Sequence, residues 1–221
     1  MATEKKSTSY PKEKINILFL ENISDAAVKQ FKDAGYSSVK KLGGALSEEQ
    51  LMALYNHTFE LKHLETGRKM ILLQCFVGMR FDDIKRIRPE NIQNNFLMFT
   101  PKKTERFDVE VEQPLNPFSK AILEEVKYDT SCYKMTNQAF NRVIKEILGL
   151  LATKEEYKDL KFKTDHTSHN FRDTFISLAV TKGVNWKSIL KWVGQSSYSI
   201  MDRYIHLTKP FEESEMKKLF G

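Results

Sequence analysis

The chain has 221 residues, which is enough for one large domain or for one domain with an appendage. Its content of 41% hydrophobic and 11% aromatic residues is that of a globular protein and excludes a chain that is largely disordered. The net charge of +6 is compatible with a polyanionic partner, because Lys and Arg side chains that neutralise phosphates release counterions. Charge alone does not decide this, since many mildly basic proteins bind no nucleic acid.

The two cysteines, Cys75 and Cys132, lie in unlike contexts, and no C-x-x-C or Cys/His cluster predicts a metal site. Cys75 falls within the apolar run Ile71–Val77, which predicts a buried thiol. No apolar run approaches the roughly 18 residues of a membrane span, and the polar start lacks the apolar region of a signal peptide. We therefore expect a reduced, cytoplasmic protein with no metal and no membrane contact.

The first part of the chain, residues 1–45, predicts a short α/β appendage after a frayed polar start. Apolar runs and helix boundary signals predict a strand, a helix and a second strand in the order Ile15–Leu20, Ser24–Gly35 and Ser37–Leu42. Ser24 is the expected N-cap of the helix, and Gly35 is the expected stop.

The remainder, residues 46–221, predicts a mainly α domain with a small β-hairpin. A capping box at Ser47–Gln50 opens the first helix, and the apolar segment 66–79 predicts a central core helix. The two hairpin strands are expected at Phe96–Phe99 and Phe107–Val111, on either side of a charged turn. Further helices are predicted at 117–126, at 136–151 with Thr136 as cap, at 168–182 before Gly183, at 185–193 before Gly194 and at 202–206.

The last third of the chain carries the most informative chemistry. His169 and Arg172 are three positions apart, so they share one face of a helix. Tyr204 follows a Gly-Gln-Ser-Ser turn that can aim it at the same place, which would put a nucleophile beside a phosphate clamp. The alternatives are ordinary ones: a tyrosine that packs a C-terminal helix, a structural histidine at a helix start and a solvated arginine.

Four segments in this order resemble the catalytic domain of tyrosine recombinases, the lambda-type integrases that cut and rejoin DNA through a 3′-phosphotyrosine. They are Gly78–Ile92, Phe96–Val111, His169–Arg172 and Trp192–Leu207. The resemblance implies the fold of that domain over 46–221 and a DNA strand-transfer activity that needs no cofactor, metal or ATP. The resemblance implies that Tyr204 is the nucleophile.

The resemblance also assigns roles around the phosphate. It implies that Arg80 and Arg172 form the clamp, because guanidinium groups bind phosphate oxygens through two parallel hydrogen bonds. Asp83 would orient Arg80 or a neighbouring catalytic group. Lys103 would protonate the departing 5′-oxygen, with its neighbour Lys102 as the alternative.

His169 would contact the phosphate or accept the tyrosine proton. His166 is close enough to be confused with it, but the His-x-x-Arg spacing selects His169. Gln195 departs from the pattern, because the family usually has histidine, or sometimes tryptophan, at this place. A glutamine amide can donate a hydrogen bond to the phosphate but cannot shuttle a proton. A non-catalytic DNA-binding or assembly remnant of a recombinase is therefore the rival interpretation.

The front end does not fit the resemblance. Tyrosine recombinases usually carry a helical core-binding domain ahead of the catalytic domain, so we expect a chain that is truncated or whose front has been replaced. The segment Ile15–Leu42 resembles the opening strand and helix of phosphoglycerate dehydrogenases. It has no G-x-G-x-x-G fingerprint, so this likeness implies no cofactor, and a dehydrogenase fragment is a weak third interpretation.

The implied partners are double-stranded DNA and further copies of the chain. A recombinase pairs its sites in a tetrameric synapse, so we expect a free monomer that assembles on DNA, in the cytoplasm and associated with the nucleoid, as part of a mobile element. The amphipathic tail Lys209–Phe220 would dock on a neighbouring copy or cover its own core.

Overall fold

The computed structural model describes residues 11–19, 25–41, 44–107 and 110–195, together with Tyr204, Thr208, Met216 and Lys217. The chain divides into two compact units, Met1–Gly43 and Gly44–Gly221, and each is described by itself.

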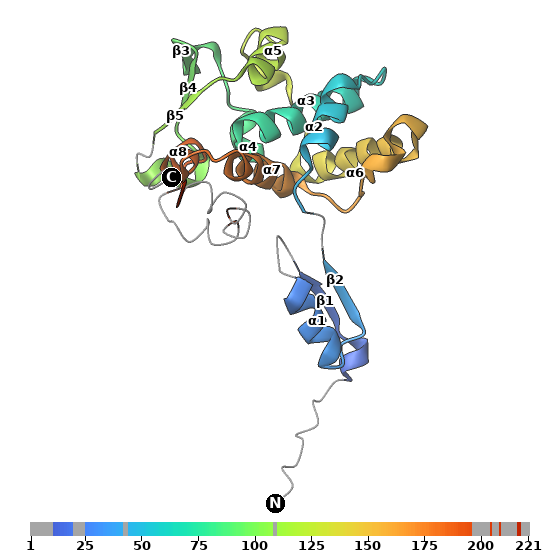
Figure 1. Cartoon of the computed structure of the whole chain (residues 1–221). Coiled ribbons are helices and arrows are strands. Elements are labelled where there is room, and N and C mark those ends of the chain that lie inside the picture. Colours follow the sequence, from blue (N-terminus) through green and yellow to red (C-terminus); the bar gives the residue numbers. More distant parts are fainter. Residues whose placement is uncertain are drawn as a thin grey trace, which may run out of the picture. The chain divides into compact units, whose positions relative to one another are not determined.

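The first unit is a strand, a helix and a strand (Figure 1). Strand β1 (Asn16–Phe19) and strand β2 (Ser38–Lys41) pair in parallel, and helix α1 (Asp25–Asp33) connects them. Gly35 follows the helix with a φ of 94°, in the left-handed region that glycine enters at no steric cost. The predicted order of elements is therefore confirmed, while the predicted cap Ser24 lies outside the described residues.

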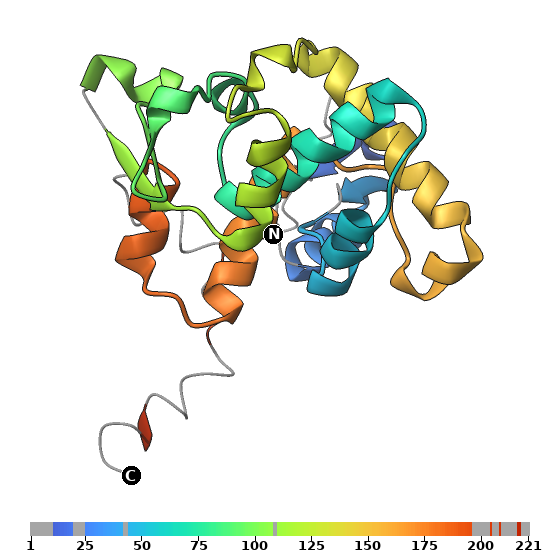
Figure 2. The same cartoon turned by 90° about the horizontal axis from the view of Figure 1, so that it is seen from above.

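The second unit is mainly helical with one small antiparallel sheet, as predicted. Its helices are α2 (Glu48–Asn56), α3 (Lys62–Val77), α4 (Phe81–Ile84), α5 (Pro117–Glu125), α6 (Asn137–Thr153), α7 (Ser168–Thr181) and α8 (Trp186–Trp192). Its strands are β3 (Ile92–Gln93), β4 (Phe96–Phe99) and β5 (Val111–Pro114), in the order β3-β4-β5. Both views place the sheet and α8 at one end of the unit and α6 at the other (Figures 1 and 2).

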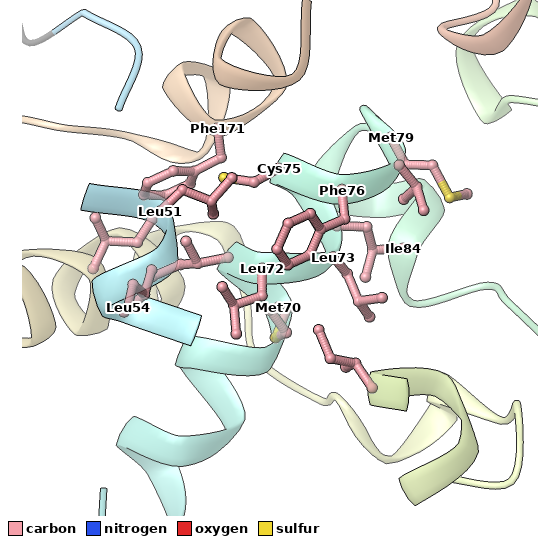
Figure 3. Close-up of a cluster of buried hydrophobic side chains, with 14 of the residues drawn as sticks. Leu51, Leu54, Met70, Leu72, Leu73, Cys75, Phe76, Met79, Ile84 and Phe171 are labelled. Atoms are coloured by element: carbon pink, nitrogen blue, oxygen red, sulfur yellow. The ribbon is translucent and has the colours of Figure 1, made fainter. Parts of the chain in front are cut away.

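Helix α3 forms the centre of this unit and packs against α2, α5, α6 and α7. Its side chains from Met70 to Val77 are all buried, and Figure 3 shows Phe171 of α7 beside Cys75 in this cluster. The helix begins four residues before the predicted start. Its first turns are polar and are stabilised by Arg68, which donates two hydrogen bonds to Glu65 at 2.6 and 2.8 Å. The predicted burial of the Cys75 thiol is confirmed.

Local boundary signals proved reliable in the second unit. The side chain of Ser47 accepts a hydrogen bond from the backbone of Gln50, and Gln50 returns one, which is the predicted capping box. Thr136 caps α6 as predicted, by accepting a hydrogen bond from Ala139 N–H. Helices α7 and α8 end just before Gly183 and Gly194, both of which have positive φ.

The second hairpin strand was predicted too early. The structure has a 3₁₀ helix at Lys102–Phe107, and β5 spans Val111–Pro114 instead of Phe107–Val111. Pairing of β4 with β5 matches Phe99 with Val111, and this register buries Val111 in the second unit. Among the described residues before it, Lys102, Lys103, Glu105 and Glu110 are exposed.

Two further expectations concern the end of the chain. The predicted short helix 202–206, apart from Tyr204, and most of the tail 209–220 lie outside the described residues. Within the described part, no helix has the length and apolarity that crossing a bilayer requires.

Candidate active site

Arg172 is a buried cation held by the ends of two helices. Its Nη1 donates to the carbonyl oxygen of Gly78 at 2.8 Å, and its Nη2 donates to that of Val193 at 2.7 Å. These residues are the C-caps of α3 and α8. Carbonyl groups at a helix C-terminus lack intrahelical partners and carry partial negative charge, so they stabilise a guanidinium that is only 8% exposed.

Two glycines make this arrangement possible. Gly78 and Gly194 have φ values of 63° and 60°. A Cβ at Gly78 would lie 2.5 Å from the Phe175 ring, and one at Gly194 would lie 2.8 Å from Cγ of Pro101. Both helix ends therefore approach their neighbours more closely than a larger residue would permit.

Arg80 lies near Arg172, at the N-cap position of α4. Its Nη1 is buried and has no hydrogen-bond partner among the described residues. Burial and the charge of Arg80 lower the pKa of Arg172 to about 10, which leaves Arg172 charged at neutral pH. Two neighbouring guanidinium groups, one with a buried unpaired donor, form a place where an anion would be stabilised.

Tyr204 lies close to Arg172. It is fully buried in the apolar cluster formed by α7 and α8, and in its ionised form the phenol would stabilise the charge of Arg172. The Tyr204 hydroxyl donates a hydrogen bond of 2.6 Å to Oδ1 of Asp173. Asp173 is a site residue that the sequence analysis missed. The available signal was an acid directly after Arg172 in the predicted helix.

His169 and His166 differ clearly in their surroundings. His169 is exposed in the first turn of α7, and its charge favours the ionised form of Asp173. His166 is buried, with its Nδ1 3.0 Å from the carbonyl oxygen of Lys163 and its ring stacked on Phe171. Burial lowers the pKa of His166, so it is a neutral core residue at physiological pH.

Asp83 anchors the turn that carries the two candidate lysines. Its buried carboxylate accepts a hydrogen bond of 2.9 Å from the backbone N–H of Lys102, and it lies 3.7 Å from Nη1 of Arg86. Lys103 follows in the 3₁₀ helix with an exposed side chain. Asp83 is thus in direct contact with the turn that bears Lys103.

Gln195 is half-buried directly after Gly194, and its backbone N–H donates to the carbonyl oxygen of Leu190 at 2.9 Å. The structure brings Arg80, Arg172 and Tyr204 together beside Asp173. The other candidates lie on adjoining segments: Lys103 on the turn held by Asp83, His169 on the first turn of α7 and Gln195 after the end of α8.

Comparison with solved structures assigns the chain a known fold. The Tn1549 transposon integrase in complex with circular intermediate DNA matches with a TM-score of 0.62 at 15% identity, covering 79% of this chain and 66% of that one. The XerH site-specific recombinase bound to its difH substrate matches with a TM-score of 0.56 at 17% identity, covering 81% of this chain. The chain has the fold of a tyrosine recombinase catalytic domain.

The recombinase fold is also shared with the XerA recombinase, at a TM-score of 0.53, 14% identity and coverage of 89% of this chain and 74% of that one. This chain spans 55% of the XerH chain. No protein-family model matches the sequence. A D-3-phosphoglycerate dehydrogenase of Dictyostelium discoideum is 32% identical over 80 residues, which covers 32% of this chain and 19% of that enzyme.

Proposed function

We propose that this chain cuts and rejoins DNA strands by transesterification, with Tyr204 as the nucleophile and a 3′-phosphotyrosine as the intermediate. The observation that carries the proposal is the pair formed by the buried Arg172 and the half-buried Arg80, close to the Tyr204 phenol. The two positive charges repel each other, and the carboxylates of Asp83 and Asp173 oppose the effect of this repulsion on Arg172. A scissile phosphate would supply a further anion and would lie next to the attacking oxygen.

In the proposed reaction the Tyr204 oxygen attacks phosphorus, and the bond to the 5′-oxygen breaks. Arg80 and Arg172 stabilise the negative charge of the pentacoordinate transition state. Lys103 gives its proton to the departing 5′-oxygen, and Asp83 holds the turn in position. The phosphotyrosine bond conserves energy similar to that of the original linkage, so the 5′-hydroxyl can attack it and restore the strand without ATP.

His169 and Gln195 complete the proposed site. We assign His169 to the phosphate, since it is exposed at the helix start that precedes Arg172. Gln195 would donate an amide hydrogen bond to the same phosphate but would carry no proton. The site would then bind its substrate fully while depending on other groups for proton transfer.

The substrate we infer is double-stranded DNA, and the further partners are copies of the chain itself. The XerH and Tn1549 integrase structures are complexes with DNA. The formal charge of +6 is compatible with the same partner. Exchange of strands between two sites requires that copies on both sites assemble together, and we propose such a synapse for a recombinase of a mobile element.

A non-catalytic DNA-binding protein is the second candidate function, and Gln195 is the observation that favours it. The buried Arg172 beside Arg80 and the buried phenol favour catalysis, because DNA binding alone requires neither a nucleophile nor a buried guanidinium. The two candidates differ in whether a covalent bond to DNA forms.

That bond can be tested with a pool of duplexes that share a randomised segment and a nick a few nucleotides beyond it. Cleavage releases a short fragment with a 5′-hydroxyl, so the protein remains attached to the strand and the sequence of the adduct identifies the target. We expect an adduct from the parent and from Tyr128→Phe, a surface control whose hydroxyl bonds Glu124 at 3.2 Å. We expect none from Tyr204→Phe, because only the attacking oxygen is removed.

An adduct from Tyr204→Phe would exclude Tyr204 as the nucleophile. Retained DNA binding with no adduct from the parent on any duplex of the pool would establish the non-catalytic candidate.

A further inference from the structure

The contact between Tyr204 and Asp173 joins a nucleophile to a carboxylate inside the protein. The phenol donates to Oδ1 over 2.6 Å, and the two side chains are 0% and 6% exposed. A short hydrogen bond between a hydroxyl and a carboxylate is charge-assisted, and burial strengthens it. The proton that Tyr204 must lose therefore already points at an acceptor.

Among the described residues, the other charged groups that act on Asp173 are His169 and Arg172 of its own helix. Arg172 has no capacity to accept a proton, since its guanidinium carries only donors. His169 could accept one, but it is exposed at the start of α7, whereas the phenol is buried against Asp173. Among these groups, Asp173 is the one that holds the phenolic proton in a hydrogen bond.

We propose that Asp173 is a catalytic residue that accepts the Tyr204 proton during attack, an inference that rests on the proposed DNA cleavage. As the Oη–P bond forms, the Oη–H bond breaks and its proton moves to Oδ1 of Asp173. The P–O5′ bond breaks at the same centre, and the 5′-oxygen takes a proton from Lys103. In the joining step the 5′-hydroxyl gives its proton back to Lys103 as it attacks phosphorus, the bond between phosphorus and the Tyr204 oxygen breaks, and Asp173 returns the proton to the phenolic oxygen.

The surroundings of Asp173 suit this role. Burial raises the pKa of the Asp173 carboxyl, while the Tyr204 hydrogen bond and the charges of His169 and Arg172 oppose that rise. A base is more effective when its pKa approaches that of the group it deprotonates, so burial makes Asp173 a better partner for a phenol than an exposed carboxylate. The charge of Arg172 opposes the rise and favours the ionised carboxylate, which is the form that can accept a proton.

The test compares Asp173→Asn with the parent on a duplex recovered from the adduct pool. Asparagine keeps the shape and the oxygen that accepts the phenol, but it cannot take a proton. We expect single-turnover cleavage at neutral pH to fall by about 10²-fold or more, with DNA binding unchanged. We also expect the rate of the variant to rise by about tenfold per pH unit, because attack then requires that the phenol has lost its proton beforehand. Asp159→Asn, an exposed acid, serves as the matched control.

A second measurement replaces Tyr204 by a difluorotyrosine, whose phenol is more acidic, both in the parent and in Asp173→Asn. If Asp173 takes the proton during attack, this replacement changes the parent rate only a few-fold, but it restores most of the rate lost in Asp173→Asn. A purely structural role for Asp173 would give a loss that neither high pH nor fluorination repairs. This readout separates proton acceptance from a folding defect.

The outcomes separate the two proposals. A parent that forms the adduct, with Asp173→Asn showing the same rate and pH profile, overturns the role of Asp173 and leaves DNA cleavage standing. A loss in Asp173→Asn that fluorination does not repair overturns it as well. A parent that forms no adduct on any duplex overturns the cleavage function, and the role of Asp173 with it.

Discussion

Replacing Arg172 by lysine tests two roles of the buried guanidinium. It joins two helix ends by hydrogen bonds, and we propose that it also binds the phosphate. In the parent, the two terminal nitrogens reach the carbonyl oxygens of Gly78 and Val193 at 2.8 and 2.7 Å. Lysine carries all its donors on one nitrogen, which cannot occupy the positions of both guanidinium nitrogens. It can therefore bond one of these carbonyls, and the other loses its partner.

The size of the loss follows from these contacts. A hydrogen bond that involves a charged group contributes about 1.5–3 kcal/mol to stability, so the loss of one lowers the free energy of unfolding by about 2 kcal/mol. A buried lysine beside Arg80 would also tend to lose its proton, since burial and a like charge both disfavour the charged form. The phosphate would also lose a bidentate guanidinium donor. Removal of one donor to the transition state slows an enzymatic reaction by about 10²–10³-fold, and we expect a loss of this size in DNA cleavage.

Two assays check the Arg172→Lys prediction: chemical denaturation for the free energy of unfolding and single-turnover adduct formation for the chemistry. Arg142→Lys, at an exposed position of α6, is the control and should match the parent in both. Arg172→Lys with an unfolding free energy within about 0.5 kcal/mol of the parent would refute the structural role. Cleavage within a few-fold of the parent would show that Arg172 does not bind the phosphate.

Three further predictions concern proton transfer, stability and DNA affinity. Gln195→His should raise the rate of adduct formation by a modest factor. Histidine adds a group that can carry a proton, at a place where we propose that the amide already bonds the phosphate. An unchanged or lower rate would mean that position 195 does not face the phosphate. Burial raises the pKa of Asp173, so its contribution to stability is present at low pH and is lost as pH rises through the folded-state pKa. Asp173→Asn should therefore melt at a higher temperature than the parent at neutral pH, with the difference shrinking toward acid pH; a variant that melts lower at neutral pH would contradict this. DNA binding measured by anisotropy should weaken by about tenfold or more between 50 and 200 mM salt, and a salt-insensitive complex would argue against a phosphate-directed interface.

The sequence by itself determined the local elements of the second unit. Caps and stops act over three or four residues, so Ser47, Thr136 and Gly194 could be interpreted without knowledge of the fold. The order of the motifs around Arg80, Arg172 and Tyr204 was likewise sufficient to predict the recombinase fold.

Only the tertiary structure decided what each of these residues touches. Arg172 is held by carbonyls of two helices that are distant from it in sequence, and Tyr204 bonds an aspartate that no spacing rule links to it. The start of β5 was likewise decided by its register with β4, because strand pairing selects which residues of an ambiguous run become extended. Contacts of this kind depend on where whole helices and strands pack, and a local pattern carries no information about a partner that lies many residues away.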